Sequence, residues 1–108
     1  PRTLFDLLEV RALLEGESAR LAALRATDVD RLLIKRCYEE MVGSHETSQP
    51  RDAREHARLD HSFHRVISEA SHNPVLVHTL QSLSELTLST VFSSVNNLYC
   101  RPFKKRQA

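Results

Sequence analysis

The stretch LDHSFHRVISEASHNPVL, residues 59–76, decides the fold, because it contains the end of one helix and the start of the next. Its apolar residues recur three and four positions apart, the spacing of one helix face: Phe63, Val66, Ile67 and Ala70. Asn73 can cap a following helix, and Pro74 suits the first turn of that helix. The stretch therefore predicts a helix over residues 51–70, a break at residues 71–74, and a further helix to about residue 98.

The residues before this stretch predict two more helices. Apolar positions recur at helical spacing over residues 4–24, where Thr3 and Asp6 form a plausible capping box. Thr27 opens a second amphipathic pattern, which Gly43 and the serine after it are expected to end. Residues 43–50 (GSHETSQP) are expected to form a loop.

The composition of the 108 residues agrees with an all-α domain. Apolar residues make up 41% and aromatic residues 6% of the chain, tryptophan is absent, and there are only two glycines. Leucine and alanine abound, which favours helices over strands. We therefore expect an antiparallel helical bundle with about four helices in this chain.

Charge and cysteine content exclude several classes of protein. The formal net charge is +1, from 15 basic and 14 acidic residues, so no overall field attracts nucleic acid or an anionic membrane. Cys37 and Cys100 are too few for a disulfide framework, and a reducing cytoplasm suits them. No apolar run reaches the roughly 20 residues that cross a bilayer. We expect a cytoplasmic protein without a membrane partner.

His56, Asp60 and His64 are spaced by four residues and form a polar stripe on the third predicted helix. An aspartate and a histidine one turn apart can both reach a divalent cation, although spacing alone favours a salt bridge on a solvated face. Three groups across two turns, about 11 Å, cannot all bind one metal. His56 is therefore a candidate for orienting a ligand. His61 is expected to point well away from His64, into solvent.

Residues 59–76 closely resemble the signature of the FadR-type C-terminal domain (FCD) of GntR-superfamily bacterial transcription regulators. Asp, Phe-His, Ile, Ala-Ser and Asn-Pro-x-Leu follow one another in the family's order. The first predicted helix agrees, since LLEVRALLEGESARLAA (residues 7–23) has the family's Glu, Arg, Leu-Glu and paired alanines. Residues 1–23 and 79–102 are also similar to regulators of glycolate-utilisation operons. The resemblance covers nearly the whole chain.

This resemblance implies a domain of six to seven helices that binds a divalent metal, with a small carboxylate effector at or beside it. Asp60 and His64 match the family's first two metal ligands, and zinc, nickel or manganese suits such ligands. The family's other two ligands are histidines on later helices, which are expected to follow the end of this chain. The metal site is therefore expected to be incomplete here, and the metal not necessarily retained.

Two further sets of side chains are candidates for binding the effector. Arg11 is flanked by apolar positions, where a guanidinium is costly unless it meets an anion. It can clamp an effector carboxylate or pair with Glu15 four residues later, and the sequence leaves both open. Asn97 and its neighbour Asn96 could donate hydrogen bonds to a 2-hydroxy acid such as glycolate, or belong to a frayed helix end.

The expected function is that of an effector-sensing and dimerisation domain, and not of an enzyme. The winged-helix DNA-binding domain is expected to be absent from residues 1–108, so DNA would be a partner only through that missing domain. Exposed apolar faces on the first and fourth helices predict a homodimer or helix exchange between copies. Two alternatives remain open: a metalloenzyme with a catalytic metal on Asp60 and His64 and His56 as proton shuttle, and a metal-free helical interaction module.

Overall fold

The computed structural model confirms the all-α prediction. It describes the backbone of residues 2–46 and 53–99, and the side chains within residues 2–43 and 53–91. These ranges fold into α-helices in the order α1 (Arg2–Arg25), α2 (Asp28–Glu46), α3 (Ala53–Ala70) and α4 (Pro74–Tyr99). Within these ranges, no helix combines the length and the apolar character needed to cross a membrane.

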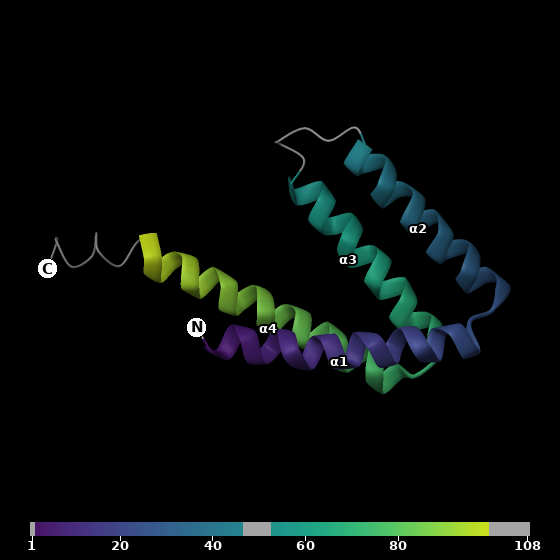
Figure 1. Ribbon diagram of the computed structural model, residues 1–108, viewed down its shortest axis with the longest axis horizontal. Coiled ribbons are helices and arrows are strands. Elements are labelled where there is room, and N and C mark those ends of the chain that lie inside the picture. Colours follow the sequence, from purple (N-terminus) through teal and green to yellow (C-terminus); the bar gives the residue numbers. More distant parts are fainter. Residues whose placement is uncertain (1, 47–52, 100–108) are drawn as a thin grey trace, which may run out of the picture.

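The helices form two antiparallel pairs that meet at an angle (Figure 1). Helix α4 runs back along α1, and α3 runs back along α2. Near the junction of the pairs, α3 also contacts α1 and α4. Three helices therefore surround the region where the two pairs meet.

The apolar core lies between α1 and α4. Leu21 from α1 packs with Leu76 and Leu80 from α4, and each is only 8% exposed. Leu14, about two turns before Leu21 on α1, packs against this cluster and is partly buried. The core is small, so each of these leucines contributes a large share of the buried apolar surface.

The break between α3 and α4 forms as the sequence predicts. The side-chain oxygen of Asn73 accepts a hydrogen bond from the backbone N–H of Leu76 at 3.1 Å, which caps α4. Pro74 occupies the first position of that helix. His72 has a φ of 52°, the left-handed conformation that commonly ends a helix.

A capping box that was not predicted from the sequence begins α2. Thr27 and Asp30 bond reciprocally: the Asp30 N–H donates to the Thr27 hydroxyl at 3.1 Å, and the Thr27 N–H donates to the Asp30 carboxylate at 2.9 Å. This exchange satisfies two backbone donors that a helix start leaves without partners.

Two local predictions are wrong. Helix α1 starts at Arg2, so Thr3 is inside the helix, and Asp6 pairs with Arg2 at 3.6 Å. Helix α2 continues through Gly43 to Glu46. A glycine inside a helix costs only about 1 kcal/mol relative to alanine, so it weakens a helix without ending it. The rest of the predicted loop, with Pro50, lies outside the described residues.

Two contacts join the turn between α1 and α2 to the turn between α3 and α4. Arg25 donates to the backbone carbonyl of Ser71 at 3.1 Å, and His72 Nε2 lies 2.7 Å from Asp30 Oδ2. We call these four residues the corner. They fix the two helix pairs to each other at one end.

The corner predicts acid-dependent stability. The pKa of Asp30 lies below its ordinary value of 3.8, first because the Thr27 N–H bonds to the carboxylate, and also because of His72. A carboxylate with a lowered pKa in the folded state stabilises the fold above its ordinary pKa. This contribution is lost as the pH falls through the lowered value. We expect Asp30→Asn to reduce the rise in melting temperature between about pH 2 and pH 5, because the variant lacks the carboxylate that stabilises the fold above its ordinary pKa.

Asp6→Asn is the control for loss of one carboxylate, because Asp6 is an exposed residue near the start of α1. Melting temperatures measured across this pH range by circular dichroism should depend less on pH in Asp30→Asn than in Asp6→Asn. Identical pH profiles for the two variants would contradict the role assigned to Asp30.

Candidate functional site

The predicted Asp60–His64 pair is present on α3. His64 Nε2 lies 3.5 Å from Asp60 Oδ1. The ring of Phe63 meets the ring of His64 edge to face, with centroids 5.6 Å apart. Phe63 and Ile67 are partly buried, as expected, but the side chains of Asp60 and His64 are 61% and 44% exposed. The pair therefore lies at the rim of the bundle, where water solvates the carboxylate.

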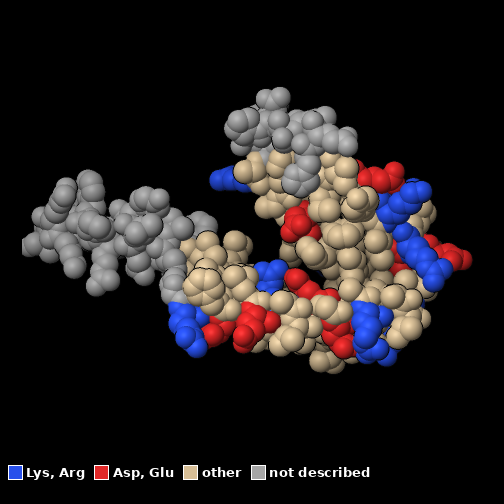
Figure 2. Space-filling model, viewed as in Figure 1, with Lys and Arg blue, Asp and Glu red and all other residues tan. Residues whose placement is uncertain are grey.

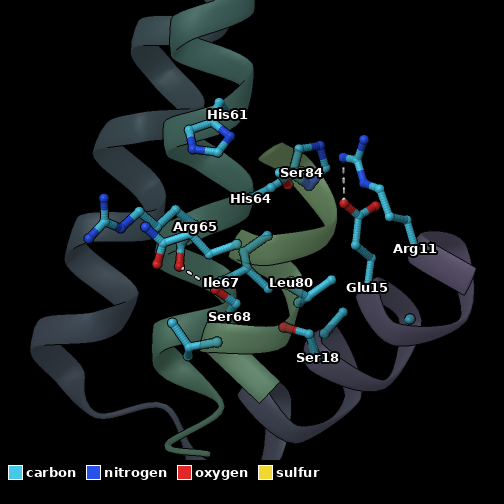
Figure 3. Close-up of a pocket in the computed structure, with 14 residues that line it drawn as sticks. Arg11, Glu15, Ser18, His61, His64, Arg65, Ile67, Ser68, Leu80 and Ser84 are labelled. Carbon is cyan, nitrogen blue, oxygen red and sulfur yellow. Dashed lines mark hydrogen bonds and ion pairs between the residues drawn. The ribbon is translucent and has the colours of Figure 1, made fainter. Parts of the chain in front are cut away.

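A cavity of about 320 Å³ lies between α1, α3 and α4 (Figure 3), and we call it the central pocket. Figure 2 shows that the molecule is hollowed between the two helix pairs, and that acidic and basic atoms meet at the inner end of the hollow. The polar residues that line the central pocket include Arg11, Glu15, Ser18, His61, His64 and Ser84. A pocket of this volume is large enough for a small molecule.

The central pocket has a charged end and a less polar end. Figure 3 shows His64 and Ser84 close to the Arg11–Glu15 pair at one end, with Ser18 at the other. Arg65 also lines the pocket, but its guanidinium extends to the far side of α3 from α1. The charged groups that a ligand can contact therefore lie mainly at the end of the pocket that contains the Arg11–Glu15 pair.

Arg11 forms the pair that the sequence left as one of two possibilities. Its Nη2 lies 3.0 Å from Glu15 Oε1, and the two side chains are 25% and 32% exposed. The Arg11 Nε, however, is buried and has no hydrogen-bond partner. A guanidinium has five N–H donors, so the pair with Glu15 leaves donors for an anion. The pairing and the anion clamp are therefore compatible.

The other predicted residues differ in their relation to the pocket. His56 is partly buried on α3 and is not among the pocket-lining residues. His61 is exposed, as expected, but it lines the same pocket as His64, so the prediction that it points well away is wrong. Residues three apart on a helix are neighbours on one face. Asn96 and Asn97 belong to α4, and their side chains lie outside the described part of the chain.

Ser18 lines the pocket and was not predicted from the sequence. It follows Arg11 by seven residues, which is close to two full helical turns and places both on one face of α1. That spacing was the available signal. A serine within an alanine-rich segment does not draw attention unless its burial is known.

The metal-binding capacity of the described residues is limited to half a site. Asp60 offers a carboxylate oxygen and His64 an imidazole nitrogen, both of which suit divalent metals. Within residues 2–43 and 53–91, no three His, Cys, Asp or Glu side chains come together in a way that could hold a metal ion. Cys37 is partly buried, and burial raises the pKa of its thiol. The donors present therefore fit a metal only if further ligands join them.

Gly16 provides a test of whether the space beside α1 at the pocket is open. It lies in the middle of α1, lines the central pocket, and an added Cβ would have no neighbour within 4 Å. Alanine has the higher helix propensity, so we expect Gly16→Ala to stabilise the protein by about 1 kcal/mol in urea unfolding. Gly43→Ala on α2 is the matched control, because its Cβ also has open space and it lies outside the pocket lining. Destabilisation by Gly16→Ala alone would contradict this reading of the open space.

Comparison with known proteins identifies similar sequences. The FCD domain family matches residues 6–103. The Glc operon transcriptional activator of Escherichia coli strain K12 is 60% identical over 107 residues, which cover 99% of this chain and 42% of the activator. No solved structure is significantly similar to this chain.

Two further relatives from the same strain are regulators of other operons. The putative L-lactate dehydrogenase operon regulatory protein is 36% identical over 98 residues, covering 91% of this chain and 35% of that protein. The galactonate operon transcriptional repressor is 36% identical over 86 residues, covering 80% and 35% respectively. The chain thus spans about two fifths or less of the length of these relatives.

Proposed function

This chain belongs to the FCD domain family of GntR-type transcription regulators, and from this premise we propose that its central pocket binds the effector of such a regulator. The observation that carries the proposal is the buried Arg11 Nε, which has no partner and belongs to a residue that lines the same pocket as His64. A guanidinium and an imidazole at one end of a cavity favour an anionic ligand.

We propose a small carboxylate as that ligand. Arg11 would bind the carboxylate with the donors that Glu15 leaves available, and Ser84 lies at the same end of the pocket. The similarity of residues 1–23 and 79–102 to regulators of glycolate-utilisation operons makes glycolate, a 2-hydroxy acid, the first candidate. Asn97 is kept as a further candidate for the hydroxyl group, on the basis of its residue type alone.

The proposed site includes a divalent metal held in part by Asp60 and His64. The family resemblance implies two more histidine ligands from later helices, which would complete a site of which this chain contributes half. When bound, zinc, nickel or manganese would supply positive charge that attracts the carboxylate. His56, one turn before Asp60, is proposed to orient that carboxylate side chain and not to bind the metal itself.

Sensing would follow from the position of the pocket between three helices. An effector that binds one packing arrangement of α1, α3 and α4 more tightly than another shifts the population toward it. In a homodimer, such a shift would change the spacing of DNA-binding domains elsewhere in the longer regulator. The similar proteins are transcription regulators, so we do not propose an enzyme.

Calorimetric titration tests the proposal. We expect glycolate, lactate or pyruvate to bind a purified protein that also contains the two further histidine ligands, in the presence of zinc or nickel, and to bind at least about tenfold more weakly after chelation of the metal. Chelated protein serves as the matched control for heats of dilution. If none of the three acids binds with metal present, the proposed effector class is wrong.

One observation favours a second candidate, the metal-free helical module. The Asp60 and His64 side chains are 61% and 44% exposed, which is also the geometry of an ordinary surface ion pair. In that case the metal would make no difference to effector binding, and the chelated and metal-loaded proteins would give the same titration.

A further inference from the structure

Two buried side-chain polar atoms in the described part of the chain have no hydrogen-bond partner, and both belong to residues that line the central pocket. They are the Arg11 Nε and the Ser18 Oγ. Buried polar groups are nearly always satisfied in native proteins, so an unsatisfied one needs an explanation. Two in one pocket point to a ligand that supplies the missing partners.

Ser18 is the exception among the buried hydroxyl groups of the described residues. Ser68, Ser71 and Thr87 each donate to a backbone carbonyl oxygen three or four residues earlier, at 2.8, 2.5 and 2.7 Å. This back-bonding is the usual way for a helical hydroxyl to satisfy itself. Ser18 is only 2% exposed and makes no such bond. Its hydroxyl therefore lacks the partner that the other three hydroxyl groups have, and a molecule in the pocket that reached it would supply one.

The position of Ser18 separates it from the charged end of the pocket. Seven residues along a helix correspond to about 10.5 Å, so Ser18 lies two turns from Arg11 on the same face of α1. Figure 3 shows the Ser18 oxygen on the side of α1 that faces α3 and α4, away from His64 and Arg11. A ligand whose carboxylate lies beside those two residues would reach Ser18 with a different part of its structure.

The surroundings of Ser18 select a neutral oxygen as its partner. Ile67, Val77 and Leu80 also line the pocket, so the walls provide apolar surface. A second carboxylate near Ser18 would be costly to desolvate with one hydroxyl to receive it. A plain alkyl group would leave the Ser18 Oγ unsatisfied. A hydroxyl or carbonyl oxygen avoids both costs, because it is uncharged and hydrogen-bonds with serine.

We propose that Ser18 hydrogen-bonds a neutral oxygen of the effector and so makes the pocket prefer oxygenated carboxylates to their unsubstituted counterparts. This inference rests on the proposed function, because it assumes that the effector is a carboxylate in the central pocket. Sites that offer a buried hydrogen-bonding group discriminate strongly against a ligand that lacks the matching group. Ser18 would thus determine specificity, whereas Arg11 and His64 would provide attraction for the carboxylate.

Titrations with matched acids test this role. The metal-loaded protein is titrated with glycolate, and with two matched pairs, 4-hydroxybutyrate with butyrate and 6-hydroxyhexanoate with hexanoate. The hydroxyl of each pair lies away from the carboxylate, because Ser18 lies about 10.5 Å along α1 from Arg11. We expect the unmodified protein to bind the hydroxylated acid of at least one pair about tenfold more tightly, and Ser18→Ala to lose that preference. Ser68→Ala is the matched control, since Ser68 lines the same pocket but donates to the Arg65 carbonyl.

Thermal melting of the ligand-free protein provides an independent measurement. Ser18→Ala removes an unsatisfied buried hydroxyl and should melt at the same temperature as the unmodified protein or higher, whereas Ser68→Ala removes a bonded hydroxyl and should melt lower.

The outcomes separate this inference from the proposed function. If the unmodified protein binds none of these acids, the proposed function fails, and the role of Ser18 with it. If it binds acids but shows no preference within either pair, or if Ser18→Ala retains the preference, only the inference about Ser18 is overturned. A lower melting temperature for Ser18→Ala, or loss of the preference in Ser68→Ala as well, also overturns it.

Discussion

In a protein that also contains the two further histidine ligands proposed above, replacing His64 with alanine is expected to lower the affinity for zinc or nickel by about 100-fold or more. His64 lines the central pocket, and its Nε2 lies 3.5 Å from Asp60 Oδ1, so both side chains can contact one cation. Loss of a residue that merely hydrogen-bonds to a metal ligand already costs about 10- to 100-fold in affinity. Loss of a metal ligand should cost at least as much, and Asp60→Ala should lower the metal affinity by a similar factor.

His61→Ala is the matched control for this experiment, because His61 is an exposed histidine on the same helix and lines the same pocket. Metal content after dialysis, measured by inductively coupled plasma mass spectrometry, should fall in His64→Ala and Asp60→Ala and remain unchanged in His61→Ala. Equal retention in all four proteins would show that the pair is a surface ion pair, and the metal-free module would replace the metal site.

The core leucine Leu76 gives the largest expected effect on stability. It is 8% exposed and packs with Leu21 and Leu80, and it lies outside the lining of the central pocket. Truncation of a buried leucine costs about 2–5 kcal/mol, through lost burial and the cavity that remains. Since small domains have only about 5–15 kcal/mol of total stability, Leu76→Ala should remove a large part of it.

Leu88→Ala on the same helix is the control, because Leu88 is 65% exposed. Its effect on the free energy of unfolding in urea should stay within about 0.5 kcal/mol. If the two variants lose equal stability, then the α1–α4 contact is not the main source of stability. In that case Leu88 would be buried in solution by contact with another copy of the chain.

The helix boundaries were predictable where local hydrogen bonds set them. Asn73 and Pro74 end one helix and begin another through contacts within a few residues, and such contacts can be inferred from sequence. Gly43 was misinterpreted because its low helix propensity is a small term that neighbouring residues can outweigh. The contact between Asp30 and His72 joins residues 42 positions apart, and no local pattern announces it.

The candidate site was predictable in its residue types and less so in its geometry. The spacing of Asp60 and His64 places them together, as observed. The expectation for His61 failed because neighbours three apart share a helix face. Ser18 could not be recognised, because an unsatisfied hydroxyl is a property of packing between α1 and its neighbours. Sequence thus indicates which groups are present, whereas burial shows which of them need a partner.

Because the corner fixes the helix pairs at one end, a tilt about it moves the opposite end of α3 the most. Arg25 and His72 hold the two helix pairs together at one end, while the far ends of α2 and α3 extend away from α1 and α4. The 18 residues of α3 span about 27 Å. A tilt of about 5° at this pivot would therefore displace the far end of α3 by about 2.4 Å. A small molecule in the central pocket that tilted α3 in this way would therefore produce the largest displacement at the end of α3 farthest from the corner.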